Sequence, residues 1–149
     1  MAFLLDTNVL SELRKGDRAN PSVSAWYATT ESRELFTSVL VLGEIRHGIE
    51  KKRAKDPMFA TRIEHWLQGV MRDYQSHILA ITLEVAELWG SLALTQTVSE
   101  PDGLIAATAL FHDLTLVSRN ESDFKATGVK TLNGVLQLNS NLLNLRDRL

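Results

Sequence analysis

Short apolar runs alternate with longer amphipathic stretches along this chain, which predicts strands and helices in turn. Strands are predicted at about residues 2–5, 34–38, 77–81 and 114–118, with a short fifth at 130–133. Helices are predicted at about 7–15, from 21 through 27, from 38 to about 55, from 57 to about 75, from 82 through 92, and from about 99 through 111. This alternation predicts an α/β protein with a central parallel sheet of four or five strands and helices on both faces.

Polar residues at the expected positions mark the predicted helix starts. Ser38 and Thr82 are suited to cap the helices that follow them, and Asp56-Pro57 combines an N-cap with a first helical proline. The helix after Ser38 carries Val41, Leu42, Ile45 and Ile49 on one apolar face. Its second half is strongly basic.

The length of 149 residues and the lack of repeats or linkers predict one domain over residues 1–149, with its core at about 3–133. The tail from 134 to 149 has no clear period, and its role stays open. The chain has no cysteine, which excludes disulfides and thiolate metal sites. The net charge of −2 makes no case for nucleic acid as a partner, although a local basic face stays open.

The N-terminal apolar run is interrupted by Asp6, too early for a signal peptide. The longest apolar run, Gly103 to Phe111, is far too short to span a bilayer. We therefore expect a soluble protein of the cytoplasm.

Four acidic residues stand at predicted ends of strands or helices. Asp6 ends the first strand, where it could simply cap the next helix. Glu44 lies at the edge of an apolar helix face, as a solvent-reaching boundary residue would. Asp102 leads the small apolar face of its helix and would also interact favourably with the helix dipole. Asp123 follows the fourth strand in a turn-forming segment.

Taken together, these acids predict a metal site. If the first and fourth strands are central, all four side chains can converge on one edge of the sheet. Crowded carboxylates raise one another's pKa unless a cation neutralises them. Oxygen ligands without Cys or paired His suit Mg²⁺, with Mn²⁺ as the alternative.

The segments around these acids resemble a known family. They are Leu5-Asp-Thr-Asn-Val-Leu-Ser-Glu-Leu13, Ser38-Val-Leu-Val-Leu-Gly-Glu-Ile-Arg-His-Gly48, Pro101-Asp-Gly-Leu-Ile-Ala-Ala-Thr-Ala109 and Leu116-Val-Ser-Arg-Asn-Glu-Ser-Asp-Phe124. In this order they are similar to the PIN-domain ribonucleases and, among these, to the VapC/FitB-type toxins of bacterial toxin–antitoxin pairs. Two positions depart from the usual pattern: Gly103 stands where Ala is commoner, and Ser118 where Thr is.

The resemblance implies a three-layer α/β/α PIN-like fold and a role for each acid. Asp6 and Asp102 would bind the metal directly, while Glu44 and Asp123 would act through water or a second ion. The four acids would form the catalytic site, with Thr7, Asn8, Ser118 and Asn120 orienting them. The implied reaction is Mg²⁺-dependent hydrolysis of RNA, in which water attacks phosphorus and the 3′ oxygen leaves.

An acidic pocket repels RNA, so basic residues nearby are needed to bind phosphates. The candidate RNA-binding residues are Arg14, Lys15, Arg46, Lys51, Lys52 and Arg53, with Lys55 in the same basic run. Each of them also fits a solvated helix face. His47 and His65 fit surface positions better than catalytic ones, and the three Trp residues, Trp26, Trp66 and Trp89, fit core or dimer contacts.

The resemblance also implies partners. Such a toxin is inhibited by a small cognate antitoxin of the VapB/FitA type, which places an Arg near the acids and itself binds operator DNA. A homodimer and a higher toxin–antitoxin assembly are implied in the same way, and no membrane is.

Other classes fit the sequence less well. Receiver domains need a phosphoacceptor Asp and a late Lys that Ser38, Ile81 and Thr131 do not provide, and Asn8 breaks the Asp-x-Asp pattern of haloacid-dehalogenase phosphatases. Two alternatives within the PIN fold stay open: a nuclease acting on DNA, and a non-catalytic scaffold that binds a protein partner.

Overall fold

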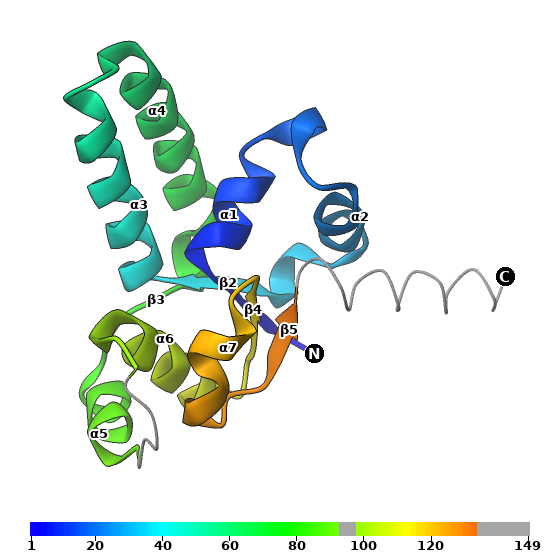
Figure 1. Cartoon of the computed structure of the whole chain (residues 1–149). Coiled ribbons are helices and arrows are strands. Elements are labelled where there is room, and N and C mark those ends of the chain that lie inside the picture. The colour runs from blue at the N-terminus through cyan, green and yellow to red at the C-terminus, as the bar shows by residue number, and fades with distance from the viewer. Residues whose placement is uncertain (93–97, 134–149) are drawn as a thin grey trace, which may run out of the picture.

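Five parallel strands form one sheet in the order β3-β2-β1-β4-β5. The computed structural model describes residues 1–92 and 98–133 (Figure 1). The strands are β1 (Phe3–Leu5), β2 (Leu35–Ser38), β3 (Ile78–Leu79), β4 (Thr115–Ser118) and β5 (Thr131–Asn133). The helices are α1 (Thr7–Leu13), α2 (Pro21–Thr29), α3 (Val39–Arg53), α4 (Pro57–Tyr74), α5 (Leu83–Ser91), α6 (Glu100–Phe111) and α7 (Glu121–Phe124). Four short 3₁₀ turns complete the described elements: η1 (Gly16–Arg18), η2 (Ser32–Glu34), η3 (Gln75–His77) and η4 (Lys125–Thr127).

The strand order explains the three layers. The chain moves outward from β1 to β3 by way of α1 to α4, and then returns past β1 to β4 and β5 by way of α5 to α7. Because crossovers between parallel strands are right-handed, reversing direction moves the later helices to the opposite face. Figure 1 shows α1 to α4 on one side of the sheet and α5 to α7 on the other. The predicted α/β/α architecture is confirmed.

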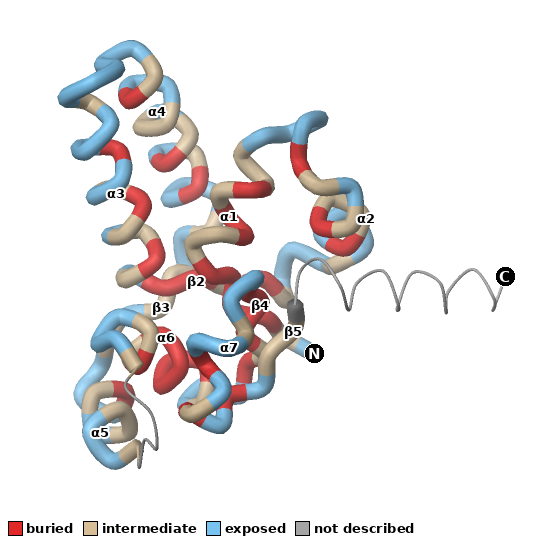
Figure 2. The backbone as a smooth tube through the Cα atoms, viewed as in Figure 1, coloured by how far each residue is buried: buried red, intermediate tan, exposed pale blue. Residues whose placement is uncertain are grey.

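The core is centred on β1 and β4, and Figure 2 shows buried chain through these strands and α6. Leu4, Leu5 and Leu116 are fully buried, as expected for strands covered on both faces. In α6, five consecutive residues from Ile105 to Ala109 are buried. The small side chains of this helix therefore let it lie close against the sheet.

The predicted helix caps are confirmed. Ser38 Oγ accepts hydrogen bonds from the backbone N–H groups of Leu40 and Val41, at 3.1 and 3.4 Å. Asp56 and Thr82 accept from the residue three positions later in the same way. These side chains satisfy amides that would otherwise lack partners at the starts of α3, α4 and α5.

Several predicted elements are shorter than expected, among them β3, α1 and α5. Strand β3 has only two residues, since His77 lies in a 3₁₀ turn with its ring stacked on Phe36 and its Nδ1 2.8 Å from the Leu35 carbonyl oxygen. Helix α1 ends at Leu13 rather than at 15, and a turn at Gly16 with φ of +57° follows. Helix α5 ends at Ser91, with Leu92 as its C-cap.

One α-helix is absent from the prediction, and the C-terminal tail is outside the description. Residues 121–124, expected as a turn, form the short helix α7. The predicted fifth strand is present as β5. The tail 134–149 lies outside the described residues. Within the described part of the chain, no helix is both long enough and apolar enough to cross a bilayer.

Candidate functional site

Asp6 lies at the carboxyl end of the central strand β1, and only 6% of it is exposed. Its backbone N–H donates to the Val117 carbonyl of β4 at 3.0 Å, which continues the sheet. Its two carboxylate oxygens accept hydrogen bonds from the Thr7 backbone N–H and from Ser118 Oγ, both at 2.8 Å. Asp6 is therefore a helix cap, and its carboxylate is fixed from β4 as well.

Glu44 is joined to the same edge of the sheet through Thr7. The Thr7 hydroxyl donates to Glu44 Oε2 at 2.5 Å and so connects the first residue of α1 to α3. Glu44 is half-buried rather than fully in solvent. The boundary position expected for Glu44 is confirmed, and Thr7 orients this second acid.

The turn after β4 is tied to α1 by Asn8. Asn8 Oδ1 accepts from the backbone N–H of Arg119 at 3.2 Å, and Asn8 Nδ2 lies 3.5 Å from Ser118 Oγ. Ser118 Oγ also accepts from the backbone N–H of Asn120 at 3.1 Å. The four residues predicted to orient the acids thus form one set of hydrogen bonds around Asp6 and Glu44.

Asp102 and Asp123 come from the other face of the sheet. Asp102 lies in the first turn of α6, where its backbone N–H donates to the Ser99 hydroxyl at 3.3 Å. Asp123 is an exposed residue of α7, a helix that packs against α6.

The four acids interact electrostatically, and this changes the pKa values of Asp6 and Asp102. Burial raises the pKa of Asp6, and the charges of Glu44 and Asp102 raise it further, against the hydrogen bonds from Ser118 and Thr7. Burial also raises the pKa of Asp102, and the charge of Asp123 adds to this rise. Each of these two carboxyls therefore lies in the field of other acids.

The negative charges of the four acids suit a divalent cation. Their side chains, however, are not already arranged to coordinate one. None of the four acids forms an ion pair with a Lys, Arg or His side chain in residues 1–92 and 98–133. In the same residues, no three or more His, Cys, Asp or Glu side chains are arranged to hold a metal ion. A bound cation would have to draw the acids together while offsetting their repulsion.

Most basic residues predicted to bind RNA have other partners. Arg46 Nη1 lies 2.6 Å from Glu64 and 3.3 Å from Glu50, and Arg53 contacts the same two carboxylates at 3.0 to 3.3 Å. These two guanidinium groups connect α3 to α4. The side chain of Lys15 pairs with Glu12, Arg14 and Lys52 lie over the Phe59 ring, and Lys51 is exposed.

The two histidines and three tryptophans considered in the sequence occupy positions that range from the surface to the core. His47 and His65 are exposed. Trp26 is in the core and meets Phe3 edge to face, with ring centroids 5.2 Å apart. Trp66 and Trp89 are half-buried.

The sequence reasoning missed Glu12 and Arg119. Glu12 is 7% exposed although it carries a charge. It accepts from Lys15 Nζ at 2.8 Å and from the Asn20 backbone N–H at 2.7 Å, and Arg119 Nη1 lies 3.5 Å away. Its spacing of three residues from Val9, which lies on the inner stripe of α1, was the available signal.

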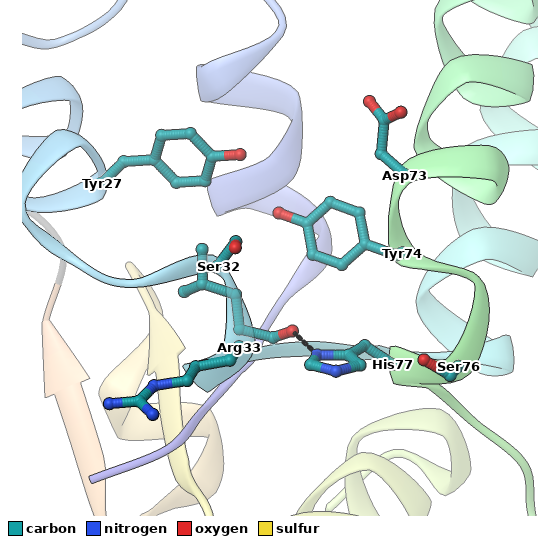
Figure 3. Close-up of a pocket in the computed structure, with 8 residues that line it drawn as sticks. Tyr27, Ser32, Arg33, Asp73, Tyr74, Ser76 and His77 are labelled. Carbon is teal, nitrogen blue, oxygen red and sulfur yellow. Dashed lines mark hydrogen bonds between the residues drawn. The ribbon is translucent and has the colours of Figure 1, made fainter.

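A cavity of about 340 Å³ lies away from the acids, where η2 and the start of β2 face the end of α4. Figure 3 shows the Tyr27 and Tyr74 hydroxyls directed toward each other across it. Tyr74 Oη is buried without a hydrogen-bond partner in the described residues, and burial raises the pKa of Tyr74. None of the predicted site residues lines this cavity.

Comparisons with known proteins identify the family of this chain. The PIN domain family model matches residues 3–130. Toxin FitB of Neisseria gonorrhoeae is 31% identical over 138 residues, covering 88% of this chain and 96% of that protein. VapC ribonuclease Y4jK of Sinorhizobium fredii is 28% identical over the same shares of the two chains.

Solved structures show the same fold. The crystal structure of FitAcB from Neisseria gonorrhoeae matches with a TM-score of 0.77 and 27% identity, covering 89% of this chain and 97% of that one. The FitAB structure bound to a DNA fragment matches with a TM-score of 0.73. This chain therefore belongs to the PIN domain family and, within it, to the group of VapC- and FitB-type proteins.

Proposed function

We propose that this protein is the toxin of a type II toxin–antitoxin system and acts as a Mg²⁺-dependent endoribonuclease. The observation that carries this proposal is the state of Asp6: its carboxylate is buried, held by Thr7 and Ser118, and close enough to Glu44 and Asp102 for their charges to raise its pKa. A folded protein that gathers acids in this way without a counter-charge is suited to bind a cation. The relatives named as a VapC ribonuclease and as a toxin support the same activity.

The residues of this chain have separate roles in the proposal. Asp6 and Asp102 bind the cation, from β1 on one side and from the first turn of α6 on the other. Glu44, held by the Thr7 hydroxyl, and Asp123, on α7, complete the site through water or a second ion. When bound, Mg²⁺ supplies water activation and charge stabilisation on the phosphoryl group, and Mn²⁺ is the alternative. Asn8, Ser118 and Asn120 keep Asp6 in place.

We also propose a cognate antitoxin as the partner that restrains this activity, and a homodimer as the toxin's own assembly. Several similar structures are toxin–antitoxin complexes, including FitAB and the VapBC proteins of Rickettsia felis and Salmonella typhimurium. An antitoxin arginine among the acids would supply the positive charge that the described residues do not.

A substrate panel tests the proposal. Purified, antitoxin-free protein is incubated with single-stranded RNA, tRNA and single- and double-stranded DNA, each with Mg²⁺, with Mn²⁺ and with EDTA. We expect the protein to cleave RNA but not DNA, and to do so only when a divalent cation is present. Cleavage of DNA alone would identify a DNA nuclease, and no cleavage of any substrate would favour a non-catalytic scaffold.

A further inference from the structure

Arg119 is a cation placed at the edge of the acid cluster. It directly follows Ser118, whose hydroxyl donates to Asp6, and its own backbone N–H donates to Asn8. The backbone of Arg119 is therefore held by Asn8, and the residue before it is held by Asp6. The Arg119 side chain is 45% exposed.

Glu12 forms an ion pair with this guanidinium group but does not use all of its N–H donors. Arg119 Nη1 is 3.5 Å from Glu12 Oε2, and among the described residues the side chain has no other carboxylate partner. Glu12 is mainly occupied by closer donors, Lys15 Nζ at 2.8 Å and the Asn20 N–H at 2.7 Å. By contrast, Arg46 and Arg53 each contact two carboxylates. Arg119 is thus oriented and still has donors to offer.

The position of Arg119 suits a phosphate beside the reacting one. Glu12 follows Asp6 by six residues along α1, which corresponds to about 9 Å along the helix axis. Among the described residues, Arg119 forms an ion pair with Glu12 and with none of Asp6, Glu44, Asp102 and Asp123. Arg119 therefore does not neutralise the acids, and its planar fork of N–H groups is free for a neighbouring phosphate oxygen pair.

We infer that Arg119 binds a backbone phosphate of the RNA adjacent to the one that is cut, and that Glu12 is the residue that positions it. This inference rests on the proposed function. It also assigns a phosphate contact to a residue outside the basic run of α3, where Arg46 and Arg53 are paired with Glu50 and Glu64.

The test compares Arg119→Gln with Arg33→Gln. Arg33 is also exposed and paired with one carboxylate, Glu31, but it lies at the amino end of β2, away from the acids. Binding of a fluorescein-labelled single-stranded RNA is measured by anisotropy over a range of salt concentrations, with Mg²⁺, in an Asp102→Asn background that prevents cleavage. The slope of log K against log salt is negative, and loss of one phosphate contact reduces its magnitude by about 0.7 on single strands.

For Arg119→Gln we expect roughly tenfold weaker binding together with this smaller slope. Arg119→Lys should restore the slope, because it restores the charge, and only part of the affinity. Arg33→Gln should change neither quantity. Unchanged affinity and slope in Arg119→Gln would overturn the inference, and a weaker affinity with an unchanged slope would show a structural role instead.

Glu12→Gln tests the positioning role in the chain with Asp102 intact. We expect KM for RNA to rise about two- to fivefold and kcat to stay within about twofold. The slope of log kcat/KM against log salt should match that of wild type, because Arg119 keeps its charge. Circular dichroism melting checks that the variant is folded. An unchanged KM would overturn the role of Glu12.

These results separate the inference from the proposed function. Wild-type protein that cleaves RNA while Arg119→Gln binds like wild type would contradict only the inference. Wild-type protein that neither binds nor cleaves RNA would contradict both.

Discussion

Asp6 is the residue at which stability and the proposed chemistry oppose each other. The chain buries its carboxylate, surrounds it with Glu44 and Asp102, and offsets this with hydrogen bonds from Thr7 and Ser118. Active sites often keep such unfavourable groups because the chemistry needs them. Asp6 should therefore lower stability in the absence of a cation.

We expect Asp6→Asn to raise the free energy of unfolding at pH 7 by about 1 kcal/mol. Because the pKa of Asp6 is raised on folding, the folded protein binds this proton more tightly than the unfolded chain. The resulting stabilisation is complete at pH values below 3.8, the ordinary pKa of an aspartate, and it is lost as the pH rises through the pKa of Asp6 in the folded protein. The advantage of the variant should thus shrink as the pH falls towards that value.

Urea denaturation across this pH range, without divalent cations, measures the effect. Asp17→Asn, at an exposed position in η1, is the control and should follow wild type. An Asp6→Asn variant less stable than wild type at pH 7 would show that the hydrogen bonds to Asp6 outweigh its burial and its acidic neighbours.

Among the elements, α6 shows most clearly how packing places a site residue. Asp102 stands in its first turn, and Gly103 next to it faces Trp89 of α5. A Cβ added to Gly103 would lie 2.8 Å from Trp89 Nε1 and 3.0 Å from Cδ1. The glycine that departs from the usual alanine therefore accommodates a tryptophan.

Gly103→Ala should destabilise the protein by about 1 kcal/mol, because overpacking outweighs the better helix propensity of alanine. Gly48→Ala is the matched control: it lies within α3 with nothing within 4 Å of the added Cβ, so it should stabilise by about 0.5–1 kcal/mol. Thermal melting of both variants and of Gly103→Ala combined with Trp89→Leu measures this. A Gly103→Ala variant as stable as Gly48→Ala would contradict the packing argument.

The elements were predictable where a local signal was strong. Ser38, Asp56 and Thr82 predicted helix starts because a capping side chain acts within three residues. Helix α7 was not predictable, since four residues are too few for a period. The burial of Glu12 depends on Asn20, eight residues later, and on Arg119, which is distant in the sequence. Only its helical spacing from Val9 indicates this burial from the sequence.

At the scale of the whole molecule, the sheet order explains the site. Placing β1 between β2 and β4 brings Asp6, the start of α3 with Glu44, and the turn after β4 to one edge. The sequence predicts this edge if strands one and four are central. It did not predict how far apart the acids stand. That residues 1–149 form a single domain stays a prediction.

A cation that joins acids from both faces of the sheet should stabilise the whole fold. Saturating Mg²⁺ or Mn²⁺ is expected to raise the melting temperature of wild-type protein by about 3 °C or more, since a ligand bound only to the folded state shifts the unfolding equilibrium. Scanning calorimetry with and without EDTA measures the shift. Asp6→Asn should show no comparable rise, and equal shifts in the two proteins would place the cation elsewhere.

The four acids are proposed to form one ribonuclease centre, and Asp102→Asn tests this most directly. This change keeps the size of the side chain and the hydrogen bond that the residue 102 backbone N–H donates to Ser99 Oγ, but removes one charge proposed to bind the cation. Initial rates of RNA cleavage are compared for wild type and Asp102→Asn purified in parallel, with Mg²⁺. We predict a loss of at least about a hundredfold, with an unchanged circular dichroism spectrum. Cleavage by Asp102→Asn at the wild-type rate would contradict the account.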